Sequence, residues 1–86
     1  VINSAEIPEI RELLRRQGEL SRAEPGCRQF TVSQDREQPK FFVLFEQWDS
    51  QAAWEIHKQA EAFQTIYAPQ VLPRVQRTPH FCELVE

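Results

Sequence analysis

The stretch FFVLFEQW at residues 41–48 decides the fold of this chain, because it reads as a β-strand that is apolar on both faces. Side chains alternate along a strand, so Phe41, Val43 and Phe45 face one way, and the even-numbered side chains, Trp48 included, face the other. One layer of helices covers only one of these faces. In a chain of 86 residues, we expect a second copy of the same chain to cover the other.

The composition is that of one ordinary globular domain spanning residues 1–86. Hydrophobic residues make up 41% and charged residues 27% of the chain, and the net charge is −3. The basic residues are dispersed; Arg15, for example, lies with Glu12 and Glu19 on what reads as a solvated helix face. The sequence has no stripe of basic residues, which nucleic-acid binding would need. It also has no apolar run long enough to span a membrane. These features favour a cytoplasmic protein.

Two cysteines, Cys27 and Cys82, are too few for a disulfide scaffold. They show no metal-type spacing with His57 or His80, so the sequence predicts no metal site. Free cysteines are usually buried, and we expect both to be small, reduced core residues.

The periodicity of the whole chain predicts an α+β fold. Apolar residues at helical spacing indicate two amphipathic helices, and alternation indicates strands on either side of them. The expected strands are 1–3, 27–33, 41–48 and 81–85, and the expected helices are 5–23 and 50–68. This order is the ferredoxin-like split βαβ pattern, with a four-stranded antiparallel sheet and both helices on one face. The other face is free to pack on a partner sheet.

Several local motifs resemble the antibiotic biosynthesis monooxygenase (ABM) family of the dimeric α/β-barrel superfamily. They are SRAEPGC at residues 21–27, FVLFEQW at 42–48, and then Ala53, His57 and Phe63. The resemblance extends over nearly the whole chain. It implies a homodimer formed through the sheet, and an aromatic-lined cavity between sheet and helices in each subunit.

Three positions depart from the family's pattern. Only Val1–Asn3 stand where the first strand belongs, so we expect that strand to be truncated or its beginning to lie outside the chain. Ala62 replaces a second His found in many members. The haem-degrading branch has a Trp and a His where this chain has His57 and Tyr67, which argues against haem degradation.

The resemblance implies a monooxygenase that acts on a phenolic, quinol-like or polycyclic aromatic small molecule without a cofactor. Such a reaction needs a base to deprotonate the substrate and a dry cavity to protect the intermediate. His57 is the expected base, because histidine exchanges protons at neutral pH. Trp48 ends its strand where it can close the cavity and donate its indole N–H to a substrate oxygen.

Four further residues are expected to contact substrate: Tyr67, Phe63, Trp54 and Asn3. Each also has a plainer interpretation. Aromatic side chains at these positions suit a core or a dimer interface, and Asn3 reaches the cavity only if the first strand is complete. His57 itself could simply hydrogen-bond a neighbouring glutamate and hold its helix in place.

Two alternatives to the monooxygenase therefore stay open. The chain could be a non-catalytic binding or accessory homodimer, in which the cavity is filled by side chains. It could also be an enzyme that isomerises a small polar metabolite, although few polar groups converge on the expected cavity. Glu46, charged within an apolar strand, is expected to pair with Arg28 across the hairpin.

Overall fold

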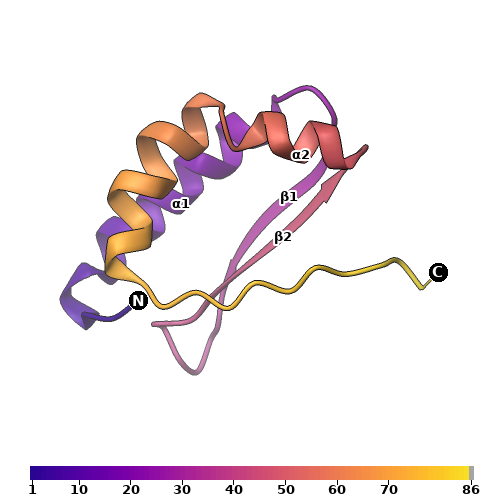
Figure 1. The fold of residues 1–86 in the computed structure, drawn as a ribbon. Helices are drawn as coiled ribbons and strands as arrows, with labels where there is room; N and C mark the ends of the chain where they lie inside the picture. Colours follow the sequence, from indigo (N-terminus) through magenta and orange to yellow (C-terminus); the bar gives the residue numbers. More distant parts are fainter. Residues whose placement is uncertain (86) are drawn as a thin grey trace.

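The computed structural model describes residues 1–85 and has an α+β architecture in which helices cover one face of a β-hairpin (Figure 1). Its elements in chain order are η1 (Ser4–Glu6), α1 (Ile7–Arg22), β1 (Cys27–Gln34), β2 (Phe42–Trp48), α2 (Gln51–His57), η2 (Ala62–Val71) and η3 (Leu72–Arg74). Helices α1 and η2 pack side by side, and α1 also lies on β1.

The predicted first helix is confirmed. The side chain of Asn3 caps the short 3₁₀ turn η1 by accepting a hydrogen bond of 3.0 Å from the backbone N–H of Ala5. Pro8 stands in the first turn of α1, where its missing N–H costs no helical hydrogen bond. The apolar stripe of α1 joins η2 in one core cluster, whose buried members are Ile10, Leu13, Leu14, Ile66 and Val71.

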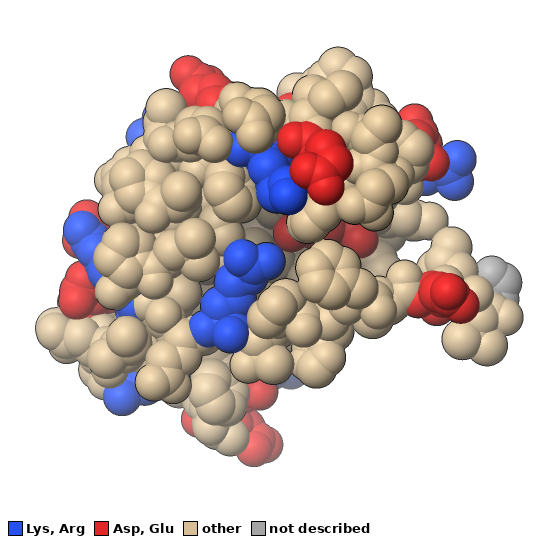
Figure 2. Space-filling model, in the orientation of Figure 1, with Lys and Arg blue, Asp and Glu red and all other residues tan. Residues whose placement is uncertain are grey.

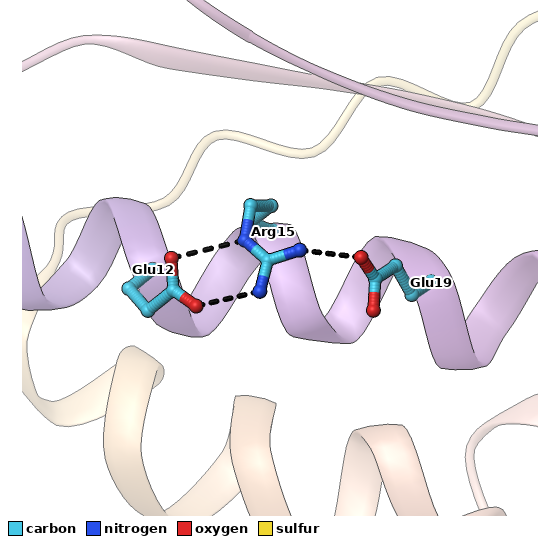
Figure 3. A network of polar contacts seen from close by, with 3 residues as sticks. All are labelled: Glu12, Arg15 and Glu19. Carbon is cyan, nitrogen blue, oxygen red and sulfur yellow. Dashed lines mark hydrogen bonds and ion pairs between the residues drawn. The ribbon is translucent and has the colours of Figure 1, made fainter.

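The exposed face of α1 carries the expected ion pairs. Arg15 forms two hydrogen bonds with the carboxylate of Glu12, at 3.0 and 2.6 Å, and one with Glu19 (Figure 3). All three side chains are more than half exposed, so solvent weakens these pairs. Acidic and basic side chains are mixed over the face shown in Figure 2, without a patch of one sign.

The predicted hairpin is also present. Strands β1 and β2 pair antiparallel, with Phe30 opposite Glu46 and Val32 opposite Leu44, and an irregularity between residues 27 and 29 disturbs the register at one end. The hairpin loop is ordered by Asp35, whose side chain accepts hydrogen bonds from two backbone N–H groups, 2.8 Å from Glu37 and 2.9 Å from Gln38.

The two faces of β2 differ as the alternation predicts. Phe42 and Leu44 are half-buried and pack against the helical core. On the opposite face, Phe41, Val43 and Phe45 are 56%, 62% and 48% exposed. The hairpin therefore presents an uncovered apolar face on the side away from the helices.

The predicted second helix is divided into two. Ser50 caps α2 by accepting from the N–H of Ala53 at 3.1 Å, but α2 ends at His57. The N–H groups of Gln59 and Ala60 bond carbonyls three residues back, which tightens the chain into a turn before the π-helix η2.

Proline 69 lies inside η2, beyond the end of the predicted helix at residue 68. In a π-helix each N–H bonds the carbonyl five residues earlier, so Pro69 has no N–H to offer the carbonyl of Gln64. The side-chain amide of the next residue, Gln70, donates to the carbonyl of Thr65, at 2.9 Å.

The prediction of four strands is not met, because the sheet of residues 1–85 has two. Val1 and Ile2 are held by the backbone carbonyls of Lys40 and Arg74, at 2.8 and 2.9 Å, rather than by a strand. Residues 81–85 extend without pairing (Figure 1). In a split βαβ sheet the last strand pairs with the first, and in this structure residues 1–3 form no strand for residues 81–85 to pair with.

The structure also corrects the expected burial of one cysteine and the expected partner of Arg28. Cys82 is exposed rather than buried, whereas Cys27 is half-buried, and both are free thiols. Arg28 pairs with Asp49, not with Glu46. Within residues 1–85, no helix combines the length and apolar character needed to cross a membrane.

Candidate functional site

The candidate site is centred on His57, the last residue of α2. Its side chain is 3% exposed, and its Nδ1 lies 2.8 Å from Oε1 of Glu24. Glu24 follows α1 at the turn that leads into β1, and its own side chain is 13% exposed. A histidine and a carboxylate from distant parts of the sequence thus meet in a nearly water-free position.

The turn after α1 brings Glu24 to this place. Gly26 has a φ of +81°, a left-handed conformation that favours glycine. A Cβ atom at Gly26 would lie 2.6 Å from Cβ of Ala53, so the turn packs directly on the first part of α2. The carbonyl of Gly26 also accepts a hydrogen bond of 2.8 Å from the N–H of Asp49. The glycine therefore fixes the end of α1 against α2, which carries His57.

Three aromatic rings enclose the imidazole. The ring of Trp48, at the end of β2, lies 4.5 Å from the His57 ring between centroids, with an interplanar angle of 33°. Phe63 of η2 meets it edge-on at 5.9 Å, and Phe30 of β1 lies 6.0 Å away. These rings occupy the space in which the sequence predicted a cavity, so His57 contacts side chains rather than solvent.

A second carboxylate faces the other nitrogen of the imidazole. Oε1 of Glu46 lies 3.8 Å from Nε2 of His57 and accepts a hydrogen bond of 3.1 Å from the indole N–H of Trp48. The side chain of Glu46 is 29% exposed. The glutamate that the sequence assigned to a structural pair with Arg28 therefore belongs to the surroundings of His57.

Tyr67 extends the aromatic cluster by one residue. Its ring lies 5.5 Å from Phe63, and the Arg77 guanidinium lies 5.7 Å from its centroid on the ring face. Burial raises the pKa of the Tyr67 phenol, and the carboxylate of Glu46 adds to this effect while Arg77 opposes it. The hydroxyl therefore stays protonated at neutral pH and can act as a hydrogen-bond donor.

The structure places two of the predicted site residues elsewhere. Trp54 contacts Phe81 edge-on at 5.7 Å and carries the ammonium group of Lys58 at 4.1 Å over its ring. Asn3 is exposed, and its side chain serves as the cap of η1. The structure thus brings His57, Trp48, Phe63 and Tyr67 together and leaves Trp54 and Asn3 outside this cluster.

Glu24 is the site residue that sequence reasoning missed. It stands in the Glu-Pro-Gly-Cys motif, which contributed to the resemblance to the family but was assigned no site residue. A carboxylate directly before a Pro-Gly turn, together with one histidine in a later helix, is the signal that could have singled it out. The pairing depends on a contact between residues 33 positions apart, which no local pattern encodes.

The arrangement suits proton transfer rather than metal or thiol chemistry. Among residues 1–85, no group of three or more His, Cys, Asp or Glu side chains is arranged so that it could hold a metal ion. Burial raises the pKa of the nearby Cys27 thiol, and the carboxylates of Glu24 and Glu46 raise it further, which disfavours a reactive thiolate. A carboxylate that orients an imidazole, by contrast, is the usual arrangement of a general base.

Hollows at the surface of residues 1–85 lie away from His57. One, of about 650 Å³, lies between the first half of α1 and the loop end of the hairpin, next to Arg11, Val32 and Phe42. The other, of about 300 Å³, lies between α1 and η2, next to Leu20 and Ile66. His57 lines neither of them, so a ligand in either hollow would not touch the imidazole.

Comparison with protein families gives one match. The sequence model described as antibiotic biosynthesis monooxygenase matches residues 2–69, which include both strands of the hairpin and every residue of the cluster around His57. No curated protein matches the chain.

Comparison with solved structures gives the same result. A crystal structure named antibiotic biosynthesis monooxygenase is 32% identical over 76% of this chain and 68% of its own length, with a TM-score of 0.71. A protein from Pseudomonas aeruginosa is 36% identical over 71% of this chain and 62% of its own, with a TM-score of 0.68. A third structure, from Nitrosomonas europaea, is 26% identical over 77% and 70% of the two chains, with a TM-score of 0.72.

Proposed function

Because this chain belongs to the antibiotic biosynthesis monooxygenase family, we propose that it is a monooxygenase of a phenolic, quinol-like or polycyclic aromatic small molecule that needs no cofactor. His57 is the base. The observation that carries the proposal is the buried 2.8 Å contact between His57 Nδ1 and Glu24 Oε1. A carboxylate in this position orients the ring and stabilises the imidazolium that forms when the base takes a proton.

The two nitrogens of His57 then have distinct tasks. Nδ1–H donates to Glu24, which leaves the lone pair of Nε2 to accept a proton from a phenol or enol. The resulting anion gives electrons to dioxygen. For a substrate CH₂ group between aromatic rings, one oxygen atom becomes the new carbonyl and the other leaves as water, so that CH₂ and O₂ yield C=O and H₂O. The proton taken by His57 returns to the leaving oxygen, and the second hydrogen of the CH₂ group leaves the same carbon as a proton when the C=O bond forms and completes the water.

Substrate access requires the aromatic cluster to open. His57 is 3% exposed, and Trp48 stacks closest to it. A flat aromatic substrate could replace the indole on the imidazole if Trp48 released its hydrogen bond to Glu46. The ring of Phe63 would then line one side of the substrate site. The protonated hydroxyl of Tyr67 would donate a hydrogen bond to a carbonyl of the substrate.

The proposal includes a homodimer formed through the hairpin. The exposed apolar face of β2, with Phe41, Val43 and Phe45, supports it, because a face of this kind is unfavourable in water. A Val43→Lys variant would place a charge in the middle of that face. We expect the wild-type chain to elute as a dimer and the variant as a monomer in size-exclusion chromatography with light scattering. A monomeric wild-type chain would contradict this part of the proposal.

The test of activity is oxygen uptake with anthrone, a tricyclic ketone whose enol form is a phenol. His57→Asn removes the base while keeping a polar side chain of similar size. We expect the initial rate to fall by a factor of at least about 100, the usual contribution of a general base. His80→Asn is the matched control, since His80 is exposed and outside the cluster, and its rate should equal that of the wild type. A folded His57→Asn variant with the wild-type rate would overturn the proposal.

One observation favours a second candidate, a non-catalytic binding or accessory dimer. His57 is buried by aromatic rings and faces a carboxylate at each nitrogen, as expected of a residue that fastens α2 to the hairpin and to the end of α1. In this case the wild-type chain takes up no oxygen with anthrone, and His57→Asn lowers only the thermal midpoint. The same two measurements therefore distinguish the two candidates.

A further inference from the structure

The buried face of α1 and the turn after it carry three polar atoms that have no hydrogen-bond partner among residues 1–85. They are Oε1 of Gln17, Oγ of Ser21 and Oε2 of Glu24. Gln17 is 1% and Ser21 0% exposed, so bulk water does not reach either side chain. Unpaired polar atoms at such depth are rare in folded proteins, and a bound water molecule is their commonest partner.

The three residues form one row. Gln17 and Ser21 are four residues apart and share one face of α1, and Glu24 comes three residues later, in the turn that follows the helix. The backbone N–H of Glu24 also bonds the carbonyl of Ser21, at 3.1 Å, so these two residues are joined directly. The row ends at Glu24, whose other carboxylate oxygen holds His57.

The unpaired atoms of these three residues are mostly hydrogen-bond acceptors, so they need a donor. Oε1 of Gln17 and Oε2 of Glu24 only accept, and the hydroxyl of Ser21 can donate to one of them at most. With the Gln17 amide oriented as it is in the structure, one acceptor therefore remains without a donor. A water molecule donates twice and accepts twice, and it is small enough for a site enclosed by helix and sheet.

We propose that Ser21, Gln17 and Glu24 hold a structural water molecule, which fixes the carboxylate of Glu24 against His57. Ser21 and Gln17 are positioning residues: they act on His57 through the water and Glu24. The existence of the water site is independent of the proposed monooxygenase activity. Only its consequence for the rate of that reaction depends on the proposed function.

The test uses the folded full chain and two readouts. A crystal structure at high resolution should show a water within hydrogen-bond distance of Ser21 Oγ and Glu24 Oε2. In the Ser21→Ala variant, the ¹⁵N resonances of the His57 ring should shift and the thermal midpoint should fall, because the water loses a partner. Ser33→Ala, at an exposed strand position, is the matched control and should change neither.

The opposite results would overturn the inference. If no water binds, Ser21→Ala and Gln17→Leu remove unpaired polar atoms, and both variants should be more stable than the wild type with unchanged His57 resonances. Absence of oxygen uptake in a chain that shows the water and the shifted resonances would contradict the proposed function alone. Oxygen uptake without the water or the shift would contradict the water site alone.

Discussion

Replacement of Gly26 by alanine should destabilise the fold at the point where the functional site is assembled. The φ of +81° costs a residue with a Cβ about 1–2 kcal/mol. The new Cβ would also lie 2.6 Å from Cβ of Ala53, well inside carbon–carbon contact distance, and overpacking of this kind costs about 1–3 kcal/mol. We expect Gly26→Ala to lower the free energy of unfolding by about 3 kcal/mol, a large share of the stability of a small domain.

The two parts of this cost can be separated with Ala53→Gly. That substitution removes the atom with which the new Cβ collides, while costing about 1 kcal/mol of helix propensity in α2 when made alone. The double variant should therefore be more stable than the sum of the two single changes predicts, by about 1–3 kcal/mol. Urea denaturation followed by circular dichroism measures all four proteins. A cost below about 0.5 kcal/mol for Gly26→Ala, or strict additivity in the cycle, would refute the packing of this turn on α2.

Three further predictions concern single side chains. Ser50→Ala removes the cap of α2 and should lower the free energy of unfolding by about 1 kcal/mol in the same denaturation assay. Burial raises the pKa of Tyr67, so above pH 10 the unfolded chain releases the phenol proton before the folded chain does. The free energy of unfolding should therefore fall as the pH rises through the folded-state pKa. The Tyr67→Phe variant should show a weaker dependence on pH. Iodoacetamide at pH 8 should label the exposed Cys82 before Cys27, whose pKa is raised by burial, and equal rates followed by mass spectrometry would contradict this order.

Local patterns predicted the elements whose stability is local. The spacing of Ile10, Leu13 and Leu14 identified α1, and the alternation along residues 41–48 identified both the hairpin strand and its uncovered face. The break in the predicted second helix after His57 was not predicted, because residues 58–61 contain no proline or glycine that would end a helix. It arises from tight backbone hydrogen bonds and from packing of η2 on α1.

Nonlocal contacts account for the rest. The aromatic residues Trp48, Phe63 and Tyr67 were expected around the cavity of His57 from the resemblance to the family, and the structure brings them together. The partner of the imidazole was not foreseen, since Glu24 reaches it only through the left-handed turn at Gly26. Strand pairing is equally nonlocal: residues 81–85 have a strand-like pattern but no first strand beside them to complete a sheet.

Glu24 and His57 should act as one unit in catalysis, and a double-variant cycle on the rate of oxygen uptake measures whether they do. Glu24→Gln removes the charge that orients the imidazole and keeps the side-chain shape, and His57→Asn removes the base. Because the effects of residues that work as a unit are not additive, we expect the double variant to be about as slow as His57→Asn alone. Losses that multiply in the double variant, or a wild-type chain without oxygen uptake, would show that the pair does not work in this way.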